Sequence, residues 1–348
     1  MLEELVRPHL KDFQPYVSAR SETGEARIFL DANELSAGSP ISFEGLALNR
    51  YPDPNQLLLR TKLGGLAGVS AGSVFVGAGS DEIIDLLFRL LCEPSTDSAV
   101  LLEPTYGVYR VAADLNGVEA VGVELDDEFQ IDVEKTLRSI RNTTKLIFCC
   151  SPNNPTGSLM RRQDILALCQ SFKGIVVADE AYIEFAGAAS LATVVESTKN
   201  LVVLRTLSKA WGLAGIRLGY SIANPELVAY LLRIKSPYNI SAVASALALT
   251  TLEMDGAVQT TVRAVIAERE RIARVLNKLT IVRQVYPSDA NFLLARFTDS
   301  ARAFEALLAH GIVVRRRSEP RLKDCLRITV GTAQENELLL SALSELSA

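Results

Sequence analysis

The sequence predicts an α/β protein, with a mostly parallel central sheet covered by helices on both faces and a smaller α+β unit after it. Two observations predict this architecture. Between residues 56 and 235, short apolar runs alternate with helical segments. These runs indicate strands that are buried on both faces, as is typical of parallel sheets. The second observation predicts the smaller unit, because after Ser236 long helices are separated by a few short apolar segments.

In both units, apolar runs predict the strands, and apolar residues at helical spacing predict the helices. In the first predicted helix, for example, Ile83, Leu87 and Leu90 fall on one face. In the large unit we expect strands at 74–76, 99–102, 120–123, 146–150, 175–178, 201–204 and 216–223, and helices at 81–91, 106–115, 131–140 and 162–172. In the small unit we expect helices at 241–252, 256–279, 301–310 and from 334, with short apolar strands at 292–295, 312–314 and 326–330.

The length and composition agree with this division. The chain has 348 residues, of which 48% are hydrophobic and 22% are charged. That is enough for one large domain with ample core and a smaller second one. We expect an N-terminal arm at 1–35, a large domain at 36–240 and a small domain at 241–348 that packs with the arm.

The composition also argues against several function classes. The net charge is −5 and the one basic block is 315–317, so a nucleic-acid partner is not expected. No stretch approaches the roughly 18 apolar residues of a membrane span, and the acidic start lacks a secretory apolar region. The five cysteines form no CxxC pair, and His9 and His310 lie far apart. We therefore expect a cytoplasmic protein without a metal site.

The most informative loop is 206–217, which lies between the last two predicted strands of the large unit. A lysine in an apolar neighbourhood has a lowered pKa and becomes an amine nucleophile, which is the role that Lys209 suggests. Ser208 and Arg217 can hold an anionic group beside it. This layout is expected of a lysine that forms a Schiff base with a phosphorylated aldehyde cofactor. Taken alone, a surface lysine in a turn explains the same residues.

Two further polar motifs follow strand ends, where ligands of parallel sheets collect. After 74–76, a glycine loop leads into a helix with Ser80 as its expected N-cap, which suits a phosphate or an ordinary capped helix. After 146–150, the rigid turn 151–157 presents the amide of Asn154, or serves only as a turn.

Three more strand ends carry candidate site residues. Asp179 follows a strand, and a buried carboxylate there needs a partner such as a pyridinium nitrogen, although an Asp-Glu pair at a strand end is more often a metal ligand or a cap. Tyr182 comes three residues later and can reach a ring hydroxyl. Tyr106 can stack on a planar cofactor or simply pack in the core. In the small unit Arg315 and Arg327 can bind a phosphate or carboxylate, whereas Arg316 and Arg317 are more typical of a surface.

Together, and in this order, these motifs resemble the fold-type-I pyridoxal-phosphate-dependent transferases, specifically the aminotransferases of the histidinol-phosphate branch. The resemblance covers nearly the whole chain. The lysine loop and the Asn-Pro-Thr-Gly turn occur across the superfamily, whereas the N-terminal pieces and the Arg327 segment are more diagnostic of the branch. The strongest pieces are 15–16, 30–34, 51–54, 151–157, 179–185, 206–217 and 325–332.

The resemblance implies a role for each matching residue. It implies that Lys209 binds pyridoxal phosphate covalently and moves the substrate proton, and that Asp179 pairs with the ring nitrogen. Asn154 and Tyr182 contact the ring hydroxyl, and Tyr106 stacks on the ring. The implied phosphate-binding residues are Gly79, Ser80, Asp81, Ser208, Arg217 and, from the neighbouring subunit, Tyr51. The implied substrate-binding residues are Tyr16, Asn33, Arg315 and Arg327.

The implied activity is transamination between histidinol phosphate and 2-oxoglutarate, giving imidazole-acetol phosphate and glutamate. A homodimer with shared active sites is implied as well. Two rival functions stay open on the same scaffold, an aromatic-amino-acid aminotransferase and a decarboxylase of phosphorylated threonine. A more distant rival is the non-catalytic sensing half of a transcription regulator, for which residues 1–30 offer no DNA-binding segment.

Overall fold

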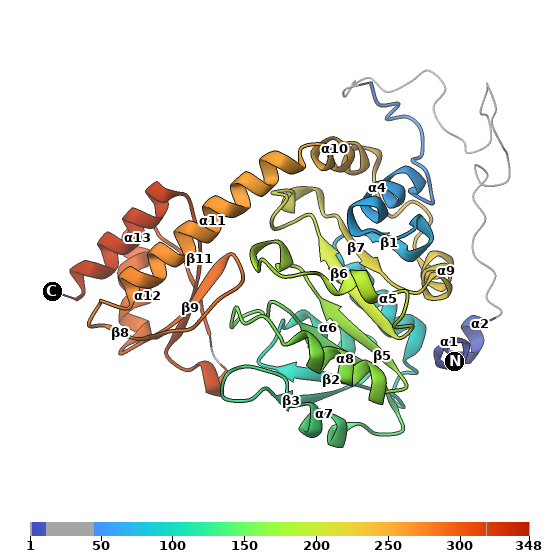
Figure 1. Ribbon diagram of the computed structural model, residues 1–348, viewed down its shortest axis with the longest axis horizontal. Helices are drawn as coiled ribbons and strands as arrows, with labels where there is room; N and C mark the ends of the chain where they lie inside the picture. Colours follow the sequence, from blue (N-terminus) through green and yellow to red (C-terminus); the bar gives the residue numbers. More distant parts are fainter. Residues whose placement is uncertain (1, 12–44, 318, 348) are drawn as a thin grey trace.

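The computed structural model describes residues 2–11, 45–317 and 319–347. A seven-stranded sheet with helices on both faces forms the centre, and a four-stranded sheet with its own helices lies beside it (Figure 1). The predicted α/β architecture with a smaller C-terminal unit is therefore confirmed. Among the described residues, no helix is both long enough and apolar enough to cross a membrane.

The large sheet has the strand order β1-β7-β6-β5-β4-β2-β3. The five strands from β2 to β6 run parallel, whereas β7 is antiparallel to both β6 and β1. The strands are β1 (Val74–Gly77), β2 (Ser98–Glu103), β3 (Glu119–Glu124), β4 (Thr144–Cys150), β5 (Ile175–Asp179), β6 (Leu201–Thr206) and β7 (Gly219–Ile222). Because β6 and β7 are antiparallel neighbours, the loop that carries Lys209 returns at the carboxyl edge of the sheet.

Side chains alternate between the two faces of this sheet, and each face has its own apolar core. On β4, Ile147 joins one core and Phe148 the other. The first core receives α4 (Leu57–Ala67), α8 (Arg162–Ser171) and α10 (Ala242–Leu252), and the second receives α5 (Ser80–Leu91), α6 (Val108–Leu115) and α9 (Pro225–Ile234). The continuous apolar runs of the sequence arise from this double burial.

The small sheet is antiparallel and has the order β10-β11-β9-β8. It packs against the C-terminal helices through a third core, and α11 extends from the large sheet to the small one (Figure 1). Its strands are β8 (Val282–Val285), β9 (Phe292–Phe297), β10 (Arg315–Arg316) and β11 (Cys325–Thr329). The remaining helices are α1 (Leu2–Leu5), α2 (Pro8–Lys11), α7 (Val133–Ser139), α11 (Asp255–Leu276), α12 (Ser300–Ala309) and α13 (Ala333–Glu345).

Several sequence expectations need correction. The expected strand at 312–314 is wrong, because Val313 is 76% exposed and pairing with β11 begins only at Arg315. The strand expected at 216–223 begins later, since Ala214–Ile216 form a turn of 3₁₀ helix. Helices α4 and α9 and strand β8 were not expected, although Asn224 and Pro225 are a recognisable start signal for α9.

A buried ion-pair cluster connects the carboxyl ends of β5 and β6, close to the loop that carries Lys209. Arg205 of β6 donates to Glu184 at 2.8 Å and lies 3.7 Å from Glu180, which directly follows β5. Glu180 also accepts hydrogen bonds from Ser190 and from the amide of Leu191. The cluster ties the loop after β5 to β6.

We expect Arg205→Ala to destabilise the protein by about 3–5 kcal/mol, because two buried carboxylates lose their cation. Urea unfolding measures this loss. The matched control is Arg138→Ala, which breaks an exposed pair with Glu134 and is expected to cost at most about 1 kcal/mol. Equal losses in the two variants would contradict a stabilising role for the buried cluster.

Candidate active site

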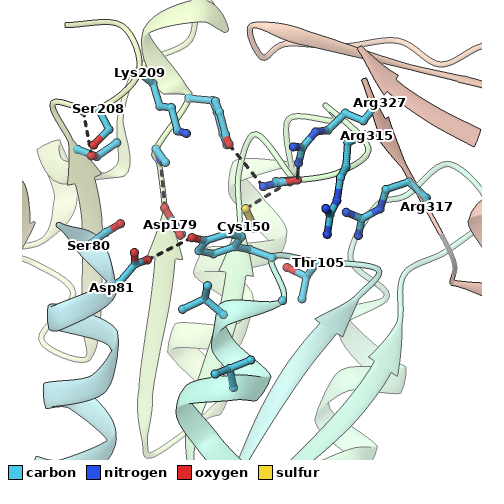
Figure 2. Close-up of a pocket in the computed structure, with 18 of the residues that line it drawn as sticks. Ser80, Asp81, Thr105, Cys150, Asp179, Ser208, Lys209, Arg315, Arg317 and Arg327 are labelled. Atoms are coloured by element: carbon cyan, nitrogen blue, oxygen red, sulfur yellow. Dashed lines mark hydrogen bonds between the residues drawn. The ribbon is translucent and has the colours of Figure 1, made fainter. Parts of the chain in front are cut away.

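A cavity of about 650 Å³ opens at the carboxyl ends of the parallel strands. Figure 2 shows Ser80, Asp81 and Ser208 at one end and Arg315, Arg317 and Arg327 at the other, with Asp179 and Lys209 between them. The structure thus brings together residues that are far apart in the chain. The sequence-predicted residues that line the cavity are Ser80, Asp81, Tyr106, Asn154, Asp179, Tyr182, Ser208, Lys209, Arg217, Arg315 and Arg327.

Asp179 ends β5 on the floor of the cavity and is only 2% exposed. Its Oδ2 accepts a hydrogen bond from the Tyr109 hydroxyl at 2.6 Å, and its Oδ1 accepts one from the Ala181 amide at 3.1 Å. Burial raises the pKa of Asp179 to about 6, and these hydrogen bonds oppose that effect. A cation placed in the cavity above Asp179 would therefore be strongly favoured.

Lys209 lies in the loop between β6 and β7, with its Nζ open to the cavity and 5.6 Å from the centre of the Tyr182 ring. Burial lowers the pKa of Lys209, and the positive charge of Arg327 adds to this effect. A lowered pKa increases the fraction of neutral amine, which is the nucleophilic and basic form. The expectation of a perturbed lysine from its apolar neighbourhood agrees with this geometry.

Asn154 connects the centre of the cavity with its arginine end. Its amide nitrogen lies 3.4 Å from the Tyr182 hydroxyl, and its amide oxygen accepts a hydrogen bond from Arg327. Burial keeps the pKa of Tyr182 above its usual value, so the phenol stays protonated. The amide of Asn154 and the hydroxyl of Tyr182 can therefore both donate hydrogen bonds to an oxygen atom of a ligand in the cavity.

The opposite end of the cavity is built around the start of α5. Gly79 (φ +81°) is the N-cap of this helix, so the expectation that Ser80 is the N-cap was wrong by one residue. The positive φ of Gly79 favours glycine, and a Cβ atom here would lie 2.7 Å from the terminal nitrogen of Arg217, so that side chain would have to move. Asp81 accepts hydrogen bonds from Arg217 at 3.3 Å and from the Tyr106 hydroxyl at 3.2 Å. The helix N-terminus, Ser208 and Arg217 together suit a phosphate.

The arginine end comes from the small sheet. Arg315 of β10 is the cross-strand partner of Arg327 on β11. Arg315, Arg316 and Arg317 all line the cavity. Figure 2 shows Arg315 and Arg317 beside Arg327, and the guanidinium of Arg316 lies 5.6 Å from the centre of the Phe304 ring. The expectation that Arg317 is a surface residue was therefore wrong, because it lines the cavity and pairs with Glu319.

Three predicted residues lie elsewhere, or outside the described part of the chain. Tyr51 is 51% exposed, stacks on Tyr238 with ring centres 4.4 Å apart, and does not line this cavity. Tyr16 and Asn33 lie outside the described residues.

Sequence reasoning also missed residues of the site. Tyr109, Thr105 and Cys150 surround its floor, and the spacing of Tyr106 and Tyr109 on one helical face was the available signal for Tyr109. The described residues contain no cluster of three or more His, Cys, Asp or Glu side chains that could hold a metal ion.

Comparison with known proteins gives consistent matches. The model of the family "Aminotransferase class I and II" matches residues 34–343. The histidinol-phosphate aminotransferase of Parabacteroides distasonis is 45% identical over 347 residues, which cover 99% of each chain.

Two solved structures are similar in fold. Histidinol-phosphate aminotransferase from Clostridium acetobutylicum has a TM-score of 0.80 at 26% identity, covering 86% of this chain and 91% of that one. The enzyme of the same name from Sinorhizobium meliloti, solved in complex with pyridoxal-5′-phosphate, has a TM-score of 0.79 at 27% identity and covers 86% and 83%.

Proposed function

The chain belongs to the class I and II aminotransferase family, and we propose that it exchanges amino groups between L-histidinol phosphate and 2-oxoglutarate. The products are imidazole-acetol phosphate and L-glutamate, which places the enzyme in histidine biosynthesis. The observation that carries this proposal is the similarity, along almost the entire chain, to histidinol-phosphate aminotransferases such as that of Parabacteroides distasonis.

The residues of the cavity fit pyridoxal phosphate. Asp179 is a buried carboxylate with a raised pKa and needs a cationic partner, which a protonated pyridine nitrogen supplies. The start of α5, Ser208 and Arg217 suit its phosphate, and Lys209 between these groups is the amine that its aldehyde requires. When bound, this cofactor supplies an aldehyde that takes up the amino group and a ring that withdraws electrons from the substrate carbon.

The protein's own residues then have distinct tasks. Asp179 would hold the proton at the ring nitrogen, and Asn154 with Tyr182 would hold the ring oxygen. Tyr106, which also lines the cavity, would cover the ring. The neutral amine of Lys209, favoured by its lowered pKa, would accept and return the proton of the substrate carbon.

The arginine end is proposed to bind the substrate's anionic group. Four arginines and one carboxylate, Glu319, line this end, so positive charge is in excess among its lining residues; the arginines are Arg315, Arg316, Arg317 and Arg327. The Nε atoms of Arg317 and Arg327 are buried and have no hydrogen-bond partner among the residues that the structure describes. An anion satisfies such donors. The phosphate of histidinol phosphate and the side-chain carboxylate of glutamate are both suited to this end.

We expect Arg327→Ala to raise KM for histidinol phosphate by about 10- to 100-fold, which corresponds to the loss of one charge-assisted hydrogen bond. Cofactor affinity is expected to change much less than KM, since Arg327 lies at the opposite end of the cavity from Ser80 and Ser208 and, within the described chain, contacts the proposed cofactor residues only through Asn154. The measurement is steady-state kinetics together with absorbance titration of the cofactor. Arg302→Ala is the matched control, because Arg302 is an exposed arginine of α12 that does not line the cavity. Equal kinetic effects of the two substitutions would contradict the assignment.

The assembly and the location are part of the same proposal. A homodimer with shared sites is supported by Tyr51, whose exposed ring lies outside its own chain's cavity, and by the exposed Leu57 and Leu58 at the start of α4. Mixing a Lys209→Ala chain with a Tyr51→Phe chain tests the sharing, because mixed dimers regain one intact site only if Tyr51 acts across the interface.

Five free, buried cysteines support a cytoplasmic location. We also propose the domain limits 1–35, 36–240 and 241–348, which the two separate sheets support.

Half-reactions of the purified holoenzyme test the proposed substrate. The cofactor spectrum is followed after adding histidinol phosphate, phenylalanine or threonine phosphate in parallel. Rapid conversion to the amino form with histidinol phosphate, reversed by 2-oxoglutarate, is the expected result. Preference for phenylalanine would favour an aromatic-amino-acid aminotransferase, and release of carbon dioxide from threonine phosphate would favour a decarboxylase.

A further inference from the structure

Tyr109 lies directly beneath the cavity and has no solvent exposure. Its ring stacks on Phe148 with centres 4.7 Å apart, and Tyr106 meets it edge-on at 5.5 Å. These two rings hold the phenol from different sides, so its hydroxyl has a defined position. From that position it donates a hydrogen bond to Asp179 at 2.6 Å.

The carboxylate of Asp179 is held at both oxygens. Tyr109 donates to one oxygen and the Ala181 amide to the other, and within the described chain these are its hydrogen-bond donors. Each carboxylate oxygen can accept a second hydrogen bond, so acceptor capacity remains toward the cavity that Asp179 lines. Burial keeps the pKa of Tyr109 well above its usual value, so the hydroxyl keeps its proton and acts as a donor.

The other titratable groups near Asp179 do not replace this contact. Asp81 raises the pKa of Asp179 and Lys209 lowers it, both through space. Burial keeps the thiol of Cys150 and the nearby phenols neutral. These neighbours come from different elements: Asp81 from α5, Tyr106 before α6, Cys150 from β4, and Tyr182 and Lys209 from the loops after β5 and β6.

We propose that Tyr109 is a positioning residue that keeps Asp179 ionised and oriented toward the ring nitrogen of the cofactor. A hydrogen bond donated to a carboxylate stabilises its charged form. Without it, the buried carboxylate competes more strongly for the proton that it shares with the ring nitrogen. The inference rests on the proposed function, because it assigns Tyr109 a task toward pyridoxal phosphate.

The test is Tyr109→Phe in the holoenzyme, with cofactor retention measured by absorbance between pH 5 and 8. As the pH falls, Asp179 becomes protonated and the cofactor is released. In the variant we expect the pH of half-release to rise by about one to two units, as for a lost hydrogen bond to a charged group. We expect kcat to fall about tenfold while KM for histidinol phosphate stays the same, because Tyr109 contacts no substrate.

Two further variants distinguish the positioning role of Tyr109 from a role in packing alone. Tyr220→Phe removes another buried phenolic hydroxyl, on β7, and is expected to leave the pH of half-release unchanged. Replacement of Tyr109 by 3-fluorotyrosine keeps the ring and strengthens the donor, so it is expected to lower that pH.

An unchanged pH of half-release in Tyr109→Phe, or shifts in the same direction for the phenylalanine and fluorotyrosine variants, would overturn the inference. If the wild-type protein binds no cofactor, the proposed function fails instead.

Discussion

Lys209→Ala is expected to abolish transamination, with kcat/KM reduced by at least about 10⁴-fold. Lys209 lines the cavity and has a lowered pKa, which supports its proposed roles as the amine that holds the cofactor and the base that moves the substrate proton. General acid–base catalysis alone contributes roughly 10²–10⁴-fold, and the loss of the covalent attachment adds to it. Activity measured with 2-oxoglutarate and histidinol phosphate gives the size of the loss.

The same variant has a spectroscopic signature. The wild-type protein is expected to be yellow, and Lys209→Ala is expected to bind the cofactor only reversibly, so that dialysis removes the colour. The matched control, Lys199→Ala, removes an exposed lysine remote from the cavity and is expected to change neither readout. A Lys209→Ala protein that turns over at the wild-type rate would overturn the site assignment.

Asp179→Asn is expected to lower kcat by about 10²–10³-fold, the usual loss on removing one preorganised electrostatic contact. Asparagine keeps the shape of the side chain but has no charge to hold the proton at the ring nitrogen. Cofactor affinity is expected to fall as well, and to lose the pH dependence that Asp179 causes. Titration of the cofactor at several pH values measures both effects.

Asp179→Asn is expected to lower activity and cofactor affinity, but to raise the stability of the cofactor-free protein at neutral pH. Burial raises the pKa of Asp179 to about 6, above the unfolded value of about 4, so the folded state holds the proton more tightly. Stability from this group is therefore present at low pH and is lost as the pH rises from about 4 to about 6. At pH 7.5, cofactor-free Asp179→Asn is expected to be more stable than wild type by about 2–3 kcal/mol.

Chemical denaturation of both proteins without cofactor, at pH 4.5 and 7.5, measures the difference. Saturation with pyridoxal phosphate should narrow or reverse the stability gap, because the cofactor stabilises the wild-type protein more. A wild-type protein whose stability rises between pH 4 and 6 through this group would contradict the assigned direction.

Much of the fold could be predicted from the sequence because its signals are local. Apolar runs such as 146–150 and 175–178 mark strands whose side chains enter apolar cores on both faces of the sheet, and no solvent-facing pattern competes with them. The segment 312–314 shows the limit of this reasoning. It is apolar, but strand formation needs a partner, and the hydrogen bonds of β11 reach Arg315 and Arg316 instead.

The sequence by itself determined which residues are proposed to carry the chemistry: Lys209 in its loop, Asp179 at a strand end, and Asn154 in its turn. Parallel strands end at one edge of a sheet, so their terminal residues had to meet. Only the tertiary structure decided that Tyr109 donates a hydrogen bond to Asp179 and that Arg317 lines the cavity and pairs with Glu319. These contacts depend on how α6 packs on the sheet and on where β10 meets β11. Both are set by long-range packing that no local pattern encodes.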